Sequence, residues 1–328
     1  MSEDKIKAIG GILERLKEAL SQVVVGQQEV IEQLAICIFA GGHALLTGVP
    51  GLGKTLLVKS VAKLFDLSFR RIQFTPDLMP ADIFGTEVME EDPGTGTRQF
   101  RFLKGPVFAN IVLADEINRT PPKTQAALLE AMGEGHVTAG RQTYPLDAPF
   151  FVLATQNPIE LEGTYPLPEA QLDRFLLNLV MDYLPMKEEA RMVQETTAAV
   201  QPELSPIVTG AEILAIQRMV REVAVSSNVA EYAVRLCAAT RPGSASASDE
   251  VRRLVQWGAG SRASQAMVLA GKARALLAGR LNVACEDVRA LALPVLRHRV
   301  ITNFRAAAEG RTAVEIIRKV VEQTPEQP

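Results

Sequence analysis

One short segment constrains this chain more than any other feature. It runs from Gly48 to Thr55, reads Gly-Val-Pro-Gly-Leu-Gly-Lys-Thr, and matches the phosphate-loop pattern G-x-x-x-x-G-K-[ST] at every fixed position. An apolar run at 44–47 precedes it and a helical pattern at 56–64 follows it, which is the context that the pattern requires. A glycine-rich turn with a surface lysine is the alternative, and these flanking elements disfavour it.

The chemistry of this loop is that of a nucleotide phosphate site. Glycines allow backbone N–H groups to converge on phosphate oxygens, and the N-terminus of the following helix adds its positive dipole end. Lys54 would supply a point charge to the β- and γ-phosphates, and the Thr55 hydroxyl would bind Mg²⁺. We expect nucleotide contacts along the whole segment and at the residue after it: Gly48, Val49, Pro50, Gly51, Leu52, Gly53, Lys54, Thr55 and Leu56.

The pattern of apolar residues predicts an α/β core followed by a helical domain. Helical patterns separate most of a series of short apolar runs, and this alternation predicts a parallel sheet covered on both faces. Beyond Pro185 the spacing is helical and we find no convincing strand, so we expect an α/β core over 1–184 and a helical domain over 185–328. The expected strands are 44–47, 69–74, 111–114, 150–155 and 175–180, with hairpins at 86–102 and 137–144.

Charge and composition exclude several classes of protein. The chain carries 35 basic and 38 acidic residues, a net charge of −3, which is wrong for a protein that coats nucleic acid. No apolar run reaches the roughly 18 residues that a membrane span needs. The acidic N-terminal sequence is not a signal peptide, and the three cysteines lie far apart. We therefore expect a cytoplasmic protein with reduced cysteines.

Two adjacent acids, Asp115 and Glu116, end the apolar run at 111–114. A parallel strand delivers its carboxyl-terminal residues to the crevice where the phosphates lie. Asp115 would hold Mg²⁺, and Glu116 would polarise an attacking water. An exposed acidic strand end is the alternative, but the pair lies some sixty residues after a phosphate loop, and paired acids favour hydrolysis by water over transfer to a substrate hydroxyl.

Further segments give the chain a resemblance to a known family. Asp115–Arg119 reads Asp-Glu-Ile-Asn-Arg, and Leu167–Phe175 reads Leu-Pro-Glu-Ala-Gln-Leu-Asp-Arg-Phe. With the phosphate loop, these segments resemble the MoxR family of AAA+ ATPases, and the similarity spans nearly the whole chain. The resemblance implies a P-loop core whose five parallel strands lie in the order 5-1-4-3-2, followed by an α-helical lid.

The resemblance also assigns roles to polar residues outside the phosphate loop. Asn157 follows the apolar run at 150–155 and corresponds to sensor 1, where an amide reaches both the γ-phosphate and a water. Arg174 matches the arginine finger, which enters the site of a neighbouring subunit. Its alternative is a structural pair with Asp173 or Glu169. Arg119 is a second candidate for contact across subunits.

Two assignments rest on the resemblance alone. Arg262, in the segment Gly258–Ala263, corresponds to sensor 2, although Gly-Ser stands here where the family usually has Ser-Pro. Its action on its own nucleotide or on a neighbour's is open at this point. Val25 and Gly26 match the edge of the family's adenine pocket.

The implied function is Mg²⁺-dependent ATP hydrolysis that drives remodelling or maturation of protein complexes. The implied partners are further copies of the chain in a ring, most simply a hexamer, and a protein client, which in this family can carry a von Willebrand factor A domain. No nucleic-acid partner is expected. A magnesium-chelatase-type subunit, a DNA-directed motor or loader, and a nucleotide switch with little turnover are the alternatives.

Overall fold

The computed structural model describes residues 3–91, 98–139, 142–157, 163–197 and 202–327. A five-stranded parallel sheet lies at its centre, with the order β2-β5-β8-β1-β9. Numbered along the chain, this is the predicted order 5-1-4-3-2, which is confirmed. The sheet strands are β1 (Ala44–Thr47), β2 (Phe69–Gln73), β5 (Ile111–Asp115), β8 (Phe151–Gln156) and β9 (Leu177–Val180).

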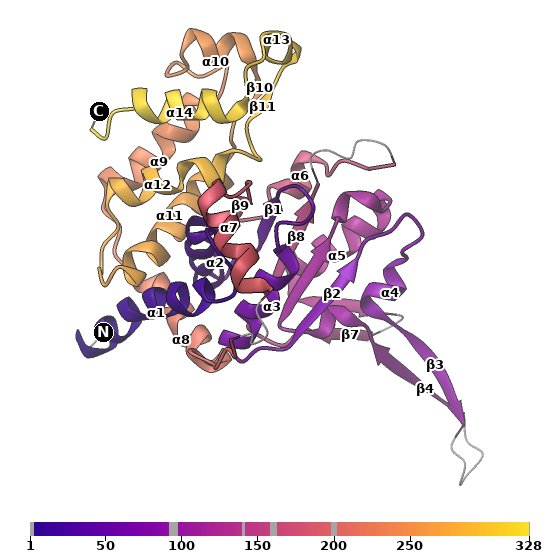
Figure 1. Ribbon diagram of the computed structural model, residues 1–328. Coiled ribbons are helices and arrows are strands. Elements are labelled where there is room, and N and C mark those ends of the chain that lie inside the picture. The colour runs from indigo at the N-terminus through magenta and orange to yellow at the C-terminus, as the bar shows by residue number, and fades with distance from the viewer. Residues whose placement is uncertain (1–2, 92–97, 140–141, 158–162, 198–201, 328) are drawn as a thin grey trace.

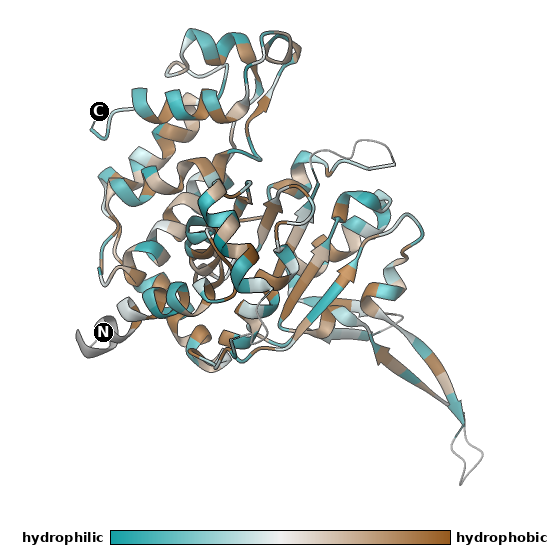
Figure 2. Cartoon of the chain, in the orientation of Figure 1, coloured by the Kyte–Doolittle hydropathy of each residue, from teal (hydrophilic) through white to brown (hydrophobic). Residues whose placement is uncertain are grey.

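The central strands are buried on both faces, as strands rich in apolar residues in a parallel sheet should be. Every residue of β5 is buried, and so are the first five of β8. Figure 2 shows these strands as largely hydrophobic, with hydrophilic helix faces outside them. The helices of this part are α1 (Glu3–Ser21), α2 (Gln28–Ala40), α3 (Lys54–Leu64), α4 (Pro80–Phe84), α5 (Pro122–Glu134) and α6 (Glu169–Leu172), with 3₁₀ turns η1 (Pro106–Phe108) and η2 (Ile117–Arg119).

Two antiparallel hairpins extend from the core. One pairs β3 (Gly85–Glu91) with β4 (Arg98–Lys104) and projects away from the body of the protein (Figure 1). The other pairs β6 (His136–Ala139) with β7 (Gln142–Pro145). The Phe102 and Tyr144 rings stack with centroids 4.2 Å apart, which joins the two hairpins. Both predicted hairpins are confirmed, while their turn residues 92–94 and 140 lie outside the described residues.

The remainder of the chain is mostly helical, and one prediction about it is wrong. A short ribbon, β10 (Val255–Trp257) with β11 (Ile301–Thr302), forms beyond Pro185, where no strand was predicted. Three- and two-residue strands are too short to show alternation in a sequence. The helices are α7 (Met186–Thr196), α8 (Gly210–Glu222), α9 (Ser227–Ala239), α10 (Asp249–Leu254), α11 (Ser261–Leu277), α12 (Cys285–Leu296), α13 (Phe304–Ala308) and α14 (Ala313–Gln323).

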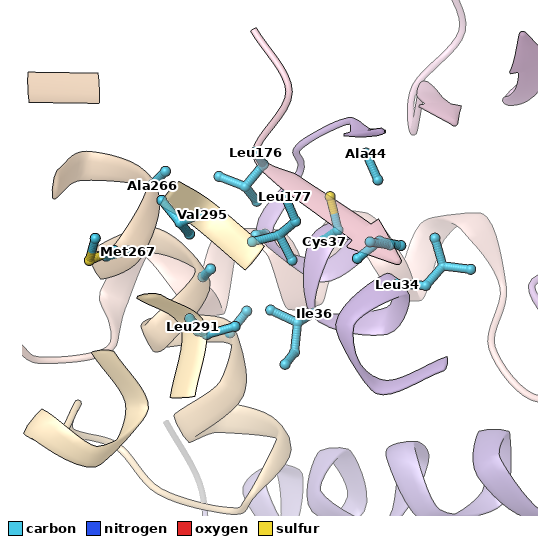
Figure 3. Packing of buried hydrophobic residues seen from close by; sticks show 14 of the residues in the cluster. Leu34, Ile36, Cys37, Ala44, Leu176, Leu177, Ala266, Met267, Leu291 and Val295 are labelled. Atoms are coloured by element: carbon cyan, nitrogen blue, oxygen red, sulfur yellow. The ribbon is translucent and has the colours of Figure 1, made fainter. Parts of the chain in front are cut away.

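A continuous apolar core joins the helical part to the sheet. Figure 3 shows residues of α2 and β9, such as Ile36 and Leu177, close to residues of α11 and α12, such as Met267 and Leu291. The helical part therefore packs against α2 and β9, so that α11 begins beside the segment that leads into β9. No helix in the described part of the chain is long and apolar enough to cross a membrane.

Candidate functional site

The phosphate loop joins β1 to α3 with the backbone that its glycines permit. Gly51 and Gly53 have φ values of +86° and +78°, a region that other residues rarely adopt. Gly53 is the N-cap of α3 and places Lys54 and Thr55 in the first turn of the helix. Lys54 Nζ donates to the Gly48 carbonyl at 2.7 Å. The loop thus brings its lysine back over its own backbone at the N-terminus of a helix, where anions are favoured.

Asp115 ends β5 at the same edge of the sheet and is only 8% exposed. Its Oδ1 accepts a hydrogen bond from Thr155 Oγ1 at 2.6 Å. Its Oδ2 accepts from Arg71, with Nε at 2.9 Å and Nη2 at 2.7 Å. These donors satisfy both carboxylate oxygens in a nearly buried position and fix the orientation of the carboxylate at the end of β5.

Glu116 follows in a left-handed conformation with φ +57°, which turns the chain out of the strand. Its backbone N–H donates to Thr155 Oγ1 at 2.8 Å. Its Oε2 accepts from Gln73 Nε2 at 2.8 Å and from Arg119 Nη1 at 3.0 Å. The carboxylate is thus partly exposed and held by two donors that reach it from β2 and from η2.

Asn157 lies directly after β8 and is 5% exposed. The preceding residue, Gln156, pairs in register with Thr47, and its carbonyl accepts from Gly48 N at 3.4 Å. The structure therefore brings Asn157, the acids and the phosphate loop together at the carboxyl edge of three adjacent strands. The phosphate-binding segment and the residues predicted to act on metal and water are thus grouped within one chain.

A mostly apolar cavity of about 260 Å³ opens beside the phosphate loop. Val25, Gly51 and Gly53 line it on one side, and Tyr183 and Met192 on the other. Its size and lining suit a nucleobase. Gly26 stands next to the cavity lining, with φ +72°, and its Cα faces Leu184 and Glu188 so closely that a side chain would collide with both.

The predicted metal ligands are an oxygen pair. Asp115 offers a carboxylate and Thr55 a hydroxyl, which are the hard donors that Mg²⁺ prefers, and Mg²⁺ commonly completes its shell with water and substrate phosphates. Within the described ranges no group of three or more His, Cys, Asp or Glu side chains could hold a metal by itself. The donor set therefore fits a magnesium ion that arrives with a nucleotide.

Arg174 and Arg262 lie away from this cluster, at the amino end of the sheet strands. Both line a cavity of about 740 Å³, which also includes His43, the residue that precedes β1. The phosphate loop begins at the other end of β1, and a strand of four residues rises roughly 13 Å. Arg174 and Arg262 are therefore remote from the phosphate loop of their own protomer.

The alternative prediction for Arg174, a structural ion pair with Asp173 or Glu169, is wrong for the described structure. Asp173 binds Arg299 Nε at 2.7 Å and lies 3.7 Å from Arg262 Nη1. Arg174 has no ion pair with the described carboxylates of Asp173 or Glu169. Instead its Nη1 donates to the Leu129 carbonyl at 2.5 Å, and its side chain remains exposed in the cavity.

Sequence reasoning missed three polar residues of the site: Arg71, Gln73 and Thr155. Arg71 and Gln73 lie on β2, and Gln73 is in register with Asp115. Thr155 lies near the end of β8 and is fully buried. The sequence did contain a signal for these residues. Each is a polar side chain near the carboxyl end of a strand that neighbours the acidic strand, and the carboxyl ends of adjacent parallel strands lie together.

Comparisons with known proteins match two parts of the chain to family models. Residues 43–177 match the model of the ATPase family associated with various cellular activities, and residues 248–320 match the AAA lid domain. Chaperone MoxR1 of Mycobacterium tuberculosis is 40% identical over 94% of this chain and 81% of its own length. Uncharacterized protein YeaC of Bacillus subtilis is 42% identical, over 94% and 93%.

A solved structure is similar across nearly its full length. It is a crystal structure of a putative ATPase from Cytophaga hutchinsonii, with a TM-score of 0.89 and 40% sequence identity. The match covers 98% of this chain and 97% of that one. The likeness therefore includes the core, the helical part and the way in which they pack together.

Proposed function

The chain belongs to the MoxR family of AAA+ ATPases, and from this premise we propose that it hydrolyses ATP with Mg²⁺ to remodel or mature protein complexes. One observation carries the enzymatic part of the proposal. Lys54, Asp115, Glu116 and Asn157, which come from three separate stretches of sequence, meet at the carboxyl edge of β1, β5 and β8. Removing the γ-phosphate of ATP requires these groups together.

Each side chain has a role that follows from its position. Lys54 and the N–H groups at the start of α3 bind the phosphates and balance their charge. Thr55 and Asp115 hold Mg²⁺, which neutralises charge on the phosphate oxygens when it is bound. In this proposal Glu116 orients and polarises the water that attacks the γ-phosphate, and the Asn157 amide binds both. Val25 and Met192, which line the cavity beside the loop, would enclose the base.

Arg174 and Arg262 complete the site of a neighbouring protomer. The sheet separates them from their own phosphate loop, yet both face one solvent-accessible cavity with Arg221. Two cations that cannot reach their own triphosphate are suited to stabilise negative charge on another. A head-to-tail arrangement that closes into a ring supplies one such pair to every site, and we propose a hexamer.

The ring would act on a protein client, as the chaperone name of the mycobacterial relative suggests. The β3–β4 hairpin projects from the core, and Met89 and Phe100, which pair across it, are 56% and 75% exposed. Exposed apolar residues on a projecting element are typical of protein contacts. A client with a von Willebrand factor A domain remains our proposal for the partner.

The catalytic proposal is tested by measuring ATP binding and phosphate release separately. Lys54→Ala should lose ATP affinity while its circular dichroism spectrum stays unchanged. Glu116→Gln should keep ATP affinity within about twofold and lose turnover, and removal of Mg²⁺ with EDTA should stop the wild type. Unchanged affinity in Lys54→Ala, or wild-type turnover in Glu116→Gln, would contradict the assignment.

A further inference from the structure

The guanidinium of Arg174 rests on the last turns of α5. Its Nη1 donates to the carbonyl of Leu129 at 2.5 Å. Leu129 lies on the helix that begins at Pro122, just after the acidic residues, and ends at Glu134. This carbonyl already belongs to the helix ladder, and its second lone pair is available to the arginine. The contact fixes one end of a long, otherwise mobile side chain.

Gly133, one helical turn after Leu129, leaves the space that the arginine occupies. A Cβ at this position would lie 2.6 Å from Arg174 Nη1 and 3.6 Å from Cζ, and apart from its own helix backbone and its chain neighbours it would meet no other described atom within 4 Å. Real Cβ contacts are essentially never shorter than 3.0 Å. Gly133 lies inside α5, and its φ is not among the positive values, so the backbone does not require glycine here.

A glycine inside a helix is unfavourable relative to alanine, because it loses more conformational freedom on folding. Gly133 nevertheless leaves space for the Arg174 side chain. If a methyl group were added, the arginine would move and the helix would not. Arg174 ends in a flexible, exposed group, whereas the Met132 carbonyl beside Gly133 accepts a hydrogen bond from His43 Nε2 at 3.1 Å.

We propose that the Leu129 carbonyl and Gly133 form a seat that holds the Arg174 guanidinium in position for the nucleotide of the neighbouring subunit. Gly133 is then a positioning residue for hydrolysis in trans, although it touches neither nucleotide. The inference rests on the proposed role of Arg174. The further point is that the rate of ATP hydrolysis depends on the position of the Arg174 guanidinium as well as on its presence.

The test compares Gly133→Ala with Arg174→Ala in the full-length protein. Gly11→Ala is the matched control, because Gly11 is also an exposed helical glycine and a Cβ there meets nothing within 4 Å. Misplacing a catalytic group by about 1 Å can cost roughly 100-fold in rate. Gly133→Ala should lower kcat about 10- to 100-fold, keep ATP affinity within about twofold, and unfold at the same temperature as the wild type or higher.

Two further measurements separate positioning from damage to the fold. The double variant Gly133→Ala/Arg174→Ala should be no slower than Arg174→Ala, because the seat acts only through the arginine. Mixing Gly133→Ala with Lys54→Ala subunits should restore turnover, since Lys54→Ala subunits carry an intact seat. Wild-type turnover in Arg174→Ala would overturn the proposed role of Arg174 in trans, while ATP hydrolysis itself would stand. Loss of turnover in Arg174→Ala but not in Gly133→Ala would overturn only the seat, as would lower stability or ATP affinity in Gly133→Ala.

Discussion

The amide of Gln73 donates to the carboxylate of Glu116 across two adjacent strands, with Nε2 2.8 Å from Oε2. Arg119 Nη1 reaches the same oxygen at 3.0 Å. These two donors hold the Glu116 carboxylate in one orientation. We expect this orientation to be a resting one, which Glu116 partly leaves when it polarises a water.

Gln73→Ala should raise the basal turnover of ATP. If its hydrogen bond stabilises the resting position by about 1 kcal/mol, its loss raises turnover about fivefold. Steady-state phosphate release at saturating ATP measures the effect. Arg70→Ala is the control, because Arg70 lies on the same strand with an exposed side chain, and its guanidinium donates to the Phe69 carbonyl rather than to either acid. A turnover below wild type would mean that Gln73 holds Glu116 in its working position instead.

Mixing two inactive variants should restore activity if Arg174 acts in trans. Arg174→Ala subunits keep an intact phosphate loop, and Lys54→Ala subunits keep an intact arginine, so mixed rings contain some complete sites. An arginine finger is worth roughly 10³–10⁵ in rate where it has been dissected in GTPases, so the restored signal should stand well above either variant alone. Mixing Arg174→Ala with the double variant Lys54→Ala/Arg174→Ala should restore nothing. Full activity in dilute monomers would refute action in trans.

Asp287→Ala should destabilise the helical part without touching the ATP site. The Asp287 side chain is fully buried and accepts from Arg274 at 2.6 Å and from both Arg280 Nη atoms at 2.6 and 2.8 Å. Burial alone would raise the pKa of Asp287, but these donors lower it overall. Because the Arg274 and Arg280 side chains are 25% and 36% exposed and can regain water, we expect the loss of these charge-assisted hydrogen bonds to cost about 1.5–3 kcal/mol.

Denaturant unfolding measures this loss. Glu286→Ala is the neighbouring control, because the Glu286 side chain is 78% exposed and its contact with Arg274 is 3.9 Å long. An exposed pair of this kind contributes at most about 1 kcal/mol. Equal losses of unfolding free energy in the two variants would show that the buried cluster stabilises the protein no more than the exposed pair does.

Acid should destabilise the protein through His43. Its Nδ1 accepts from the Val152 N–H at 3.0 Å and its Nε2 donates to the Met132 carbonyl, so the ring is neutral. Burial lowers the pKa of His43 from 6.5 to about 4, although the Met132 carbonyl acts in the opposite direction. The unfolded chain therefore takes up a proton first, and stability falls as pH drops through this interval.

Between pH 7 and pH 5 the contribution of His43 is about 2 kcal/mol. His43→Gln removes the titrating ring and should flatten the dependence of the unfolding free energy on pH by that amount. His298 shifts in the same direction, because burial lowers its pKa well below 6.5, and it remains in both proteins. His136→Gln, on β6, is the control. The same pH slope in His43→Gln and wild type would rule out His43 as the source.

Short-range sequence determined the phosphate loop, the acidic strand end and most strands. The loop is contiguous from Gly48 to Thr55, and its function depends on residues that are neighbours in the chain. The strand β1 was predicted at 44–47 and lies there, because a buried parallel strand appears as an apolar run between turns. The order of the strands followed from family resemblance rather than from periodicity.

Only the tertiary structure decided which residues surround the two acids and where the arginines lie. Arg71 and Asp115 are 44 residues apart, and Gln73 and Glu116 are 43 apart. The register of β2 against β5 brings them together, and no local pattern encodes a register between distant strands. The seat of Arg174 depends likewise on α5 ending beside the segment that enters β9. Gly133 lies against the side chain of Arg174, which is 41 positions further along the chain. Only the folded chain brings these two residues together.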